Sequence, residues 1–273
     1  MPTLSIITVN YNNNKGLIAS IESIKQQSFT DYEHIIIDAG STDGSLETIK
    51  QYAEESSHLS FWCSEPDKGV YDGMNKGIEH ASGVYFNFLN SGDCLKKDIL
   101  RHIDFDGTKY IYGDVSILFP NNRVDNITSP YPVDPIFIIL KDTICHQACF
   151  IHKSLFNNKR YDITYKLASD WIHIVENIIF KECSYKHVPF SVVDYDGCGM
   201  SATSGSLGVE ERMRWIKQNI PSTFYNSLIE LDLYKSSELA NLIPRMQHDH
   251  KFQKRARKIV RTLWKIHCIF HKK

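Results

Sequence analysis

Polar side chains gather where four short apolar runs of the sequence end. Such side chains can bind a small polar ligand if the fold brings them together. They are Thr8, Asn10 and Tyr11, then Asp38, then Glu65 to Lys68, and finally Asn90, Ser91, Gly92 and Asp93. In parallel sheets ligands bind outside the carboxyl ends of the strands. The pattern therefore indicates a binding site at one edge of a sheet.

The apolar runs alternate with helical patterns. Apolar and β-branched runs predict strands over Leu4–Val9, Glu33–Ile37, Leu59–Cys63 and Val84–Leu89. Apolar residues at helical spacing predict helices over Lys15–Gln27, Ser45–Ala53 and Tyr71–Ala81. Four strands with intervening helices predict an α/β fold with a mostly parallel, Rossmann-like sheet and right-handed crossovers.

Two common phosphate-binding loops are absent. The turn after the first strand reads Asn10 to Gly16 and lacks GxGxxG, so a dinucleotide-dependent oxidoreductase is disfavoured. No Walker A loop is present either. Phosphate would have to be bound by side chains or a metal ion.

The composition excludes several other classes. The chain has 273 residues, 42% of them hydrophobic, with 14 Gly and 9 Pro, which excludes collagen-like and disordered chains. The longest apolar run, Ile136–Leu140, is far shorter than the roughly 20 residues of a spanning helix. The first residues lack the pattern of an export signal, so we expect a cytoplasmic protein. Seven cysteines without a repeated CxxC pair predict neither a disulfide framework nor a zinc ribbon.

Three segments resemble family 2 glycosyltransferases of the GT-A fold. They are Leu4–Asn12, Ile37–Ser45 and Ser64–Ile78, the last continuing into Phe88–Asp93. The third is similar to the branch that builds O-antigen and capsule repeat units. The resemblance covers residues 1 to about 200. It implies a glycosyltransferase domain over 1–205, with a nucleotide-binding half (1–93) and an acceptor-binding half (94–205), followed by a helical extension over 206–273.

The resemblance assigns a UDP-sugar to the strand ends. In this family the corresponding residues hold uracil, which implies that role for Thr8, Asn10, Tyr11 and Asp38. A tyrosine ring can stack on a base, and a carboxylate can accept a ring N–H. The alternative is that Asp38 caps its loop and Tyr11 is a core aromatic.

The same resemblance assigns the ribose and the phosphates to the third segment. The residues implied are Asp67, Lys68, Asp72, Asn75 and Lys76. For Asp72 and Lys76 a solvated helical face is the alternative.

The turn Asn90–Asp93 is where the family binds a divalent cation, Mn²⁺ or Mg²⁺. The family usually has Asp-x-Asp followed by a further Asp, whereas this chain keeps a single carboxylate. We assign Asp93 as the metal ligand, with Asn90 as a helper and Ser91 beside the donor. A hard cation would neutralise the charge that builds on the leaving diphosphate. A turn-capping Asp93 is the alternative.

Asp170 stands in Lys166–Ile172, which resembles the family segment that carries the catalytic base. An apolar stripe from Ala168 to Ile179 predicts a packed helix, and at about 100° per residue Asp170 lies roughly 200° from Ala168, facing outward. The resemblance implies that Asp170 deprotonates the acceptor hydroxyl, and one displacement means inversion at the anomeric carbon. The alternative is an acid that merely favours the helix dipole.

Two further segments resemble family elements near the acceptor. Ile144–Ala148 implies an acceptor or metal contact for His146, with a hydrogen-bonded core histidine as the alternative. Gly197–Ser201 resembles a flexible lid, which implies roles for Gly199 and Ser201 in closing over the diphosphate. An ordinary loop is the alternative there.

The charge of the chain is unevenly distributed. Residues 245–273 hold ten Lys or Arg and one acid, whereas residues 1–244 carry a net charge of −10. The pattern over 249–270 predicts a basic amphipathic helix that binds an anionic membrane surface, the inner face of the plasma membrane in a cytoplasmic protein. Packing on the body or on a partner chain is the alternative. Nucleic acid is disfavoured because no aromatic stacking platform accompanies the basic face.

Two functions follow from these patterns. The first is an inverting, metal-dependent transfer of a sugar from a UDP donor to a polysaccharide or lipid-linked acceptor of a cell-surface glycan. The second is a nucleotide-sugar-binding or scaffolding protein without activity, because Gly92 stands where the family has a carboxylate. The sequence leaves the sugar, the linkage and the oligomeric state open.

Overall fold

The computed structural model describes residues 1–199, 204–235, 254–255 and 258. The chain forms two compact units, Met1–Asn219 and Ile220–Lys273. The first unit holds all of the strands described below and every functional residue that follows.

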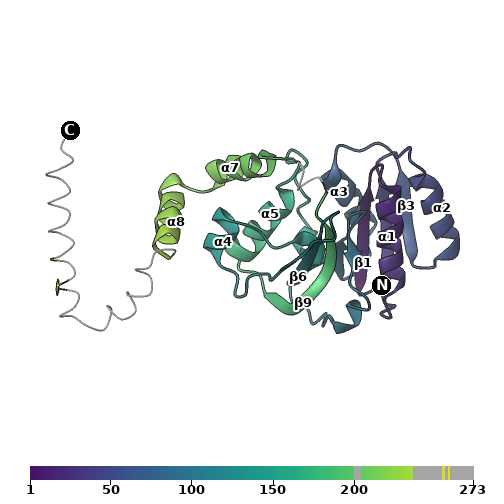
Figure 1. The fold of residues 1–273 in the computed structure, drawn as a ribbon, viewed down its shortest axis with the longest axis horizontal. Coiled ribbons are helices and arrows are strands. Elements are labelled where there is room, and N and C mark those ends of the chain that lie inside the picture. Colours follow the sequence, from purple (N-terminus) through teal and green to yellow (C-terminus); the bar gives the residue numbers. More distant parts are fainter. Residues whose placement is uncertain (200–203, 236–253, 256–257, 259–273) are drawn as a thin grey trace. The chain divides into compact units, whose positions relative to one another are not determined.

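The first half of this unit is the predicted parallel sheet with its helices. The strands are β1 (Leu4–Asn10), β2 (Tyr32–Asp38), β3 (Leu59–Ser64) and β4 (Tyr85–Phe88), and the helices are α1 (Asn14–Lys25), α2 (Ser45–Glu55) and α3 (Val70–His80). The strands are parallel and lie in the order β3-β2-β1-β4. These seven elements confirm the predicted ones to within two residues at each end. Figure 1 shows this half in purple and blue.

The two faces of the first half are covered by different helices. Gly73 and Gly77 of α3 lie against Val9 and Ile7, where an added Cβ would approach the valine to 2.7 Å and the isoleucine to 2.4 Å. On the other face Leu17 and Ile21 of α1 join Ile36, Ile49 and Tyr52 in one buried cluster. The small residues of α3 thus bring its backbone close to the sheet beside the strand ends.

The second half extends the same sheet with antiparallel and parallel strands. Its elements are β5 (Cys94–Leu95), η1 (Leu100–His102), β6 (Tyr110–Leu118), β7 (Val124–Ile127), α4 (Pro135–Leu140), η2 (His146–Ala148), β8 (Cys149–His152), η3 (Lys153–Phe156), α5 (Ser169–Ile174), the π-helical η4 (Val175–Phe180) and β9 (Tyr185–Asp196). The strand order continues β4-β8-β6-β9-β5, with β7 on β6. Because β8 runs antiparallel to β4, it carries η2 to the carboxyl end of β4, beside the polar turn.

Helix α7 (Leu207–Asn219) belongs to the first unit. Its Trp215 ring meets the buried Trp171 ring of α5 edge to face at 5.3 Å. The unit therefore ends at Asn219, whereas the sequence analysis placed the domain boundary between 205 and 206. The contact makes α7 part of the support of α5.

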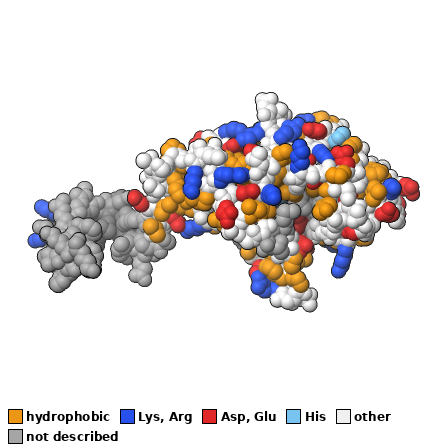
Figure 2. Space-filling view, turned by 90° about the horizontal axis from the view of Figure 1, so that it is seen from above, with side chains coloured by type: hydrophobic (Ala, Val, Ile, Leu, Met, Phe, Trp, Pro, Cys, Tyr) orange, Lys and Arg blue, Asp and Glu red, His pale blue; other side chains and the backbone are white. Residues whose placement is uncertain are grey.

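The second unit contains α8 (Ser222–Lys235). The basic helix predicted over 249–270 lies outside the described residues except for Lys254, Arg255 and Lys258, which are helical and exposed. In the described part of the chain no helix is long and apolar enough to cross a membrane. Figure 2 shows basic and acidic side chains interspersed over one face of the molecule.

Candidate active site

Asp38 is the centre of a buried hydrogen-bond network at the ends of β1 and β2. Its carboxylate accepts bonds from Asn10 Nδ2 at 2.7 Å, Ser64 Oγ at 2.6 Å and the Ser41 backbone and hydroxyl. Burial favours the neutral acid, but these bonds outweigh it and hold the pKa of Asp38 below its usual value. The bond from the Ser41 backbone shows that Asp38 caps its loop. Its contact with uracil stays a prediction.

Tyr11 and Thr8 are placed very differently. Tyr11 is 64% exposed, so the alternative of a core aromatic is wrong and its ring is free to stack on a base. Thr8 is fully buried in mid-strand, and its hydroxyl lies 2.9 Å from His34 Nε2. The pleat directs Thr8 towards the α2 side of the sheet, so the structure does not bring it to the site.

The loop before α3 and the first turn of that helix carry three of the residues predicted to contact the ribose and the phosphates. Lys68 is exposed, while one oxygen of Asp67 accepts the Gly69 N–H and the other is buried without a partner among the described residues. Asp72 accepts the backbone N–H of Lys68 at 3.0 Å. Hydrogen bonds therefore hold the loop Asp67–Gly69 against the first turn of α3.

Asn75 and Lys76 are engaged elsewhere. The Asn75 amide exchanges two hydrogen bonds with the backbone of Tyr161, at 2.8 and 2.9 Å. Lys76 pairs with Glu65 at 2.8 Å. Asn75 therefore joins α3 to the segment before α5, and a direct donor contact stays a prediction for both residues.

The turn Asn90–Asp93 is held by side chains of α1. Ser20 Oγ donates to the carbonyl of Asp93 at 2.7 Å and accepts the N–H of Gly92 at 3.0 Å. Asn13, which caps α1, donates to the carbonyl of Ser91 at 2.9 Å. Position 92 has φ +105°, a conformation that residues with a Cβ rarely adopt. The glycine in place of the family's carboxylate is therefore a requirement of this backbone.

Asp93 is buried, with 4% of its surface exposed. Its carboxylate accepts the backbone N–H of Asp196 at 2.9 Å and Nε2 of Gln147 at 3.1 Å. Burial raises the pKa of Asp93 to about 6, and the nearby carboxylate of Asp196 also raises it. The two hydrogen bonds and His146 lower this pKa, but their effect is smaller than that of burial.

Two further residues with side-chain oxygens, Asp196 and Asn90, belong to segments that hydrogen-bond to Asp93 through their backbones. Asp196 comes from the end of β9, and the Asn90 amide oxygen is buried without a partner among the described residues. In the described ranges no three His, Cys, Asp or Glu side chains are grouped to hold a metal ion. Mg²⁺ is commonly held by one or two carboxylates together with substrate phosphates, so this donor set fits such an ion.

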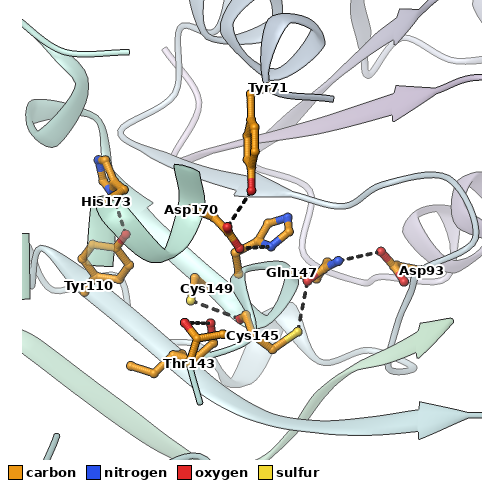
Figure 3. A network of polar contacts seen from close by, with 11 residues as sticks. Tyr71, Asp93, Tyr110, Thr143, Cys145, Gln147, Cys149, Asp170 and His173 are labelled. Atoms are coloured by element: carbon orange, nitrogen blue, oxygen red, sulfur yellow. Dashed lines mark hydrogen bonds and ion pairs between the residues drawn. The ribbon is translucent and has the colours of Figure 1, made fainter. Parts of the chain in front are cut away.

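Asp170 sits in the first turn of α5 between two partners. The hydroxyl of Tyr71 donates to its Oδ1 at 2.6 Å, and Nδ1 of His146 lies 2.9 Å from its Oδ2. Figure 3 shows Tyr71 pointing toward Asp170. Burial by itself would raise the pKa of Asp170, but the charge and hydrogen bond of His146 and the bond from Tyr71 lower it to about 2. Asp170 is therefore ionised at neutral pH.

The predicted outward orientation of Asp170 is wrong. Its side chain is only 13% exposed, because α3 supplies Tyr71 on one side and η2 supplies His146 on the other. Helical spacing identified the face of α5 correctly, but it could not reveal that other elements cover that face.

The start of α5 is fixed from α7. The buried carboxylate of Glu211 accepts the backbone N–H groups of Lys166 and Leu167, both at 2.8 Å. Hydrogen bonds of this kind, to a charged acceptor, are stronger than neutral ones. They hold the segment that delivers Asp170 to the site.

The segment predicted to be a lid follows β9. Gly199 donates its N–H to the carbonyl of Asp196 at 3.1 Å, which places it next to Asp93 and its partners. Ser201 lies outside the described residues. Closing over the diphosphate stays a prediction for both.

Sequence reasoning missed four residues of this site: Tyr71, Gln147, Asp196 and Glu211. Tyr71 and Gln147 stand inside segments already singled out, next to Asp72 and His146. Asp196 and Glu211 carried no local signal, because their roles arise from β9 and α7 folding back onto the site.

Comparisons with known proteins identify the class. Residues 5–163 match Glycosyl transferase family 2. A PGL/p-HBAD biosynthesis glycosyltransferase of Mycobacterium bovis (strain BCG / Pasteur 1173P2) is 31% identical over 177 residues, which cover 62% of this chain and 67% of that protein. The putative teichuronic acid biosynthesis glycosyltransferase TuaG of Bacillus subtilis is 35% identical over 100 residues, covering 37% and 40%.

The fold has solved counterparts. Residues 1–349 of S. aureus TarS, in complex with UDP-GlcNAc, superpose with a TM-score of 0.63 at 17% identity, over 93% of this chain and 78% of that one. The fold is therefore GT-A, as expected. The chain belongs to glycosyl transferase family 2 and is a glycosyltransferase.

Proposed function

We propose that the protein transfers a sugar, with inversion, from a UDP-sugar to a saccharide or lipid-linked saccharide acceptor in the biosynthesis of a cell-surface glycan. A nucleotide-sugar donor is supported by the TarS complex with UDP-GlcNAc, and a glycan product by the name of TuaG. The uracil of UDP would stack on the exposed ring of Tyr11 and contact the hydrogen-bond network around Asp38.

The observation that carries this proposal is the convergence of two carboxylates. Asp93 is bound to Gln147 and Asp170 to its neighbour His146, so the two acids approach the same short segment, η2, from different elements. Asp93 follows the donor-side strand β4, while Asp170 comes from the acceptor-side helix α5. The single ionised carboxylate of Asp170 suits the proton-accepting step of one displacement, which inverts the anomeric carbon.

A divalent cation, Mn²⁺ or Mg²⁺, is part of the proposal. Asp93 would hold it, with Asp196 and Asn90 as further oxygen ligands. A bound cation neutralises the negative charge of a leaving diphosphate. Asp67, Lys68 and Asp72 would border the ribose and the phosphates.

The test is UDP release from a panel of UDP-sugars with Mn²⁺ or Mg²⁺ and several saccharide acceptors. Turnover that needs the cation and is lost in Asp170→Asn supports the proposal. Asp142→Asn, an exposed acid in the same half of the unit, is the matched control and should retain activity. UDP binding without turnover of any sugar of the panel would favour the scaffolding function instead.

Membrane association is proposed from the sequence alone. The net charge of +9 over residues 245–273 suits an anionic surface, where a lipid-linked acceptor would be found. Deleting 245–273 should release the protein from anionic vesicles and leave UDP binding intact. Unchanged vesicle binding would refute the anchoring role.

A further inference from the structure

The loop before α5 and the helix α7 pack together and form one surface. Arg214 of α7 donates a hydrogen bond to the carbonyl of Thr164 at 3.0 Å. Glu211 of the same helix accepts two backbone N–H groups of the loop. These contacts hold residues 159–167 and 207–219 side by side. Helix α7 lies along the top of the molecule in Figure 1, which is the side that Figure 2 views.

The exposed charged side chains of this surface are mostly basic. Two exposed acids, Asp162 and Glu210, stand against five exposed basic residues, and a third acid, Glu176, is partly buried and pairs with Lys159. The five basic residues are Lys159, Arg160, Lys166, Arg214 and Lys217. Residues 1–244 carry a net charge of −10, so a positive surface is an exception on this body. It attracts a negatively charged partner.

Two apolar side chains of the same segments are also exposed. Val209 of α7 is 64% exposed and Ile163 of the loop is 39% exposed. Proteins that bind at a membrane surface combine basic residues, which contact the anionic headgroups, with apolar residues, which enter the acyl boundary. A polyanion without an apolar part would bury neither of these two side chains. The combination therefore favours an anionic lipid surface over a nucleic acid or a charged glycan.

This surface lies beside the helix that carries the proposed base. The backbone N–H of Asp162 donates to Ser169 Oγ at 2.7 Å, and Ser169 directly precedes Asp170. A lipid-linked saccharide keeps its lipid in the bilayer. A membrane docked on this surface would hold such an acceptor on the same side of the protein as Asp170.

We infer that the five basic residues together with Ile163 and Val209, here called the basic face, dock on an anionic lipid surface and present the site to a lipid-linked acceptor. The inference rests on the acceptor in the proposed function and adds a membrane contact within the first unit. Residues 245–273, with a net charge of +9, would supply most of the attraction. The basic face then sets the orientation of the first unit on the membrane.

The first test measures binding of the full chain to vesicles of phosphatidylcholine with phosphatidylglycerol. Near an anionic surface each basic residue contributes a factor of about five, so Arg160→Gln/Lys217→Gln should bind about 10- to 30-fold more weakly. Val209→Ser should weaken binding roughly threefold or more. The matched control is Lys50→Gln/Lys97→Gln, two exposed lysines of the other half of the unit, which should bind like the wild type.

The second test locates the contact by hydrogen–deuterium exchange of the full chain with and without the vesicles. Amides within 159–167 and 207–219 should exchange more slowly on the vesicles. Protection confined to residues 245–273, or equal vesicle affinity of the wild type and Arg160→Gln/Lys217→Gln, overturns the inference. Protection of the basic face by dextran sulfate but not by vesicles overturns it in favour of a polyanionic partner.

These outcomes are separate from those of the proposed function, because docking is measured without turnover. A wild-type chain that docks through the basic face but releases no UDP from any sugar of the panel overturns the transfer reaction and leaves the docking contact standing. A chain that turns over a UDP-sugar but shows no protection of the basic face overturns only the inference. UDP binding, measured by calorimetry, verifies that each variant is folded.

Discussion

Asp93 and Asp170 lie 77 positions apart in the sequence and bind to consecutive residues. Gln147 Nε2 donates to Asp93 at 3.1 Å, and His146 Nδ1 lies 2.9 Å from Asp170. Figure 3 shows Gln147 between Asp93 and the group around Asp170. The segment η2 therefore fixes the relative positions of the two carboxylates. A substitution at any of these four residues is expected to change the distance between them.

Tyr71→Phe tests the support of Asp170 from α3. The substitution removes one hydrogen bond to an ionised carboxylate, which contributes about 1.5–3 kcal/mol in proteins. We expect kcat to fall roughly tenfold or more, with little change in KM for the donor, because the ring and its contact with Tyr161 remain. Steady-state kinetics with the active UDP-sugar measure this split.

The control for Tyr71→Phe is Tyr131→Phe. Tyr131 is 64% exposed, and its ring stacks on the imidazole of His187. Tyr131→Phe should have the same kcat and the same KM for the donor as the wild type. A Tyr71→Phe enzyme with unchanged kcat would show that His146 alone orients the carboxylate.

The first half of the fold was predictable because its signals are local. Apolar periodicity and polar strand ends gave β1 to β4, α1 to α3 and the positions of Asp38 and Asp93. The second half depends on pairings between distant segments, such as β8 against β4 and β9 beside β6, which periodicity does not encode. For the same reason Thr8, predicted at the site from its position near a strand end, is buried against His34.

Glu211→Gln tests whether α7 holds the base-bearing helix. The buried carboxylate accepts two backbone N–H groups at 2.8 Å, and a glutamine offers one acceptor oxygen in place of two. The other N–H then faces an amide donor, a loss of about 1–3 kcal/mol. We expect a lower free energy of unfolding in urea and a reduced kcat with UDP affinity unchanged.

Glu210→Gln is the neighbouring control. Glu210 is exposed, and its carboxylate accepts a hydrogen bond from the hydroxyl of Ser206. Its variant should unfold like the wild type within about 0.5 kcal/mol. An equal decrease in the free energy of unfolding of Glu210→Gln and Glu211→Gln would contradict a specific role for Glu211.

His34 predicts how stability depends on pH. It is fully buried between Thr8 and Tyr52, and burial lowers its pKa from 6.5 to about 3. Between these two values the unfolded chain binds a proton that the folded chain does not, so stability falls as the pH falls. At about 1.4 kcal/mol per pH unit, this group makes the protein about 2 kcal/mol less stable at pH 5 than at pH 7.5.

Urea unfolding of His34→Gln at several pH values measures this contribution. Glutamine does not titrate and can keep a polar contact with Thr8. The stability of the variant should therefore decline less steeply between pH 7.5 and 5. The exposed His102→Gln should follow the wild type. Parallel curves for wild type and His34→Gln would show that His34 becomes protonated within the folded protein.

Gly92→Asp restores the acid that the family usually has in this turn, and we expect it to harm the protein. Position 92 has φ +105°, and a Cβ there would lie 3.2 Å from Asn13 Nδ2 and 3.4 Å from Asp196 Oδ2. The strained backbone costs about 1–3 kcal/mol, and a second carboxylate next to Asp196 adds repulsion. Gly107→Asp provides the comparison, because Gly107 has φ +92° with no atom within 4 Å. Both variants should have a lower free energy of unfolding in urea. Only Gly92→Asp should also lose Mn²⁺-dependent UDP release. A gain of activity in Gly92→Asp would show that the turn can relax to accept the family's usual acid.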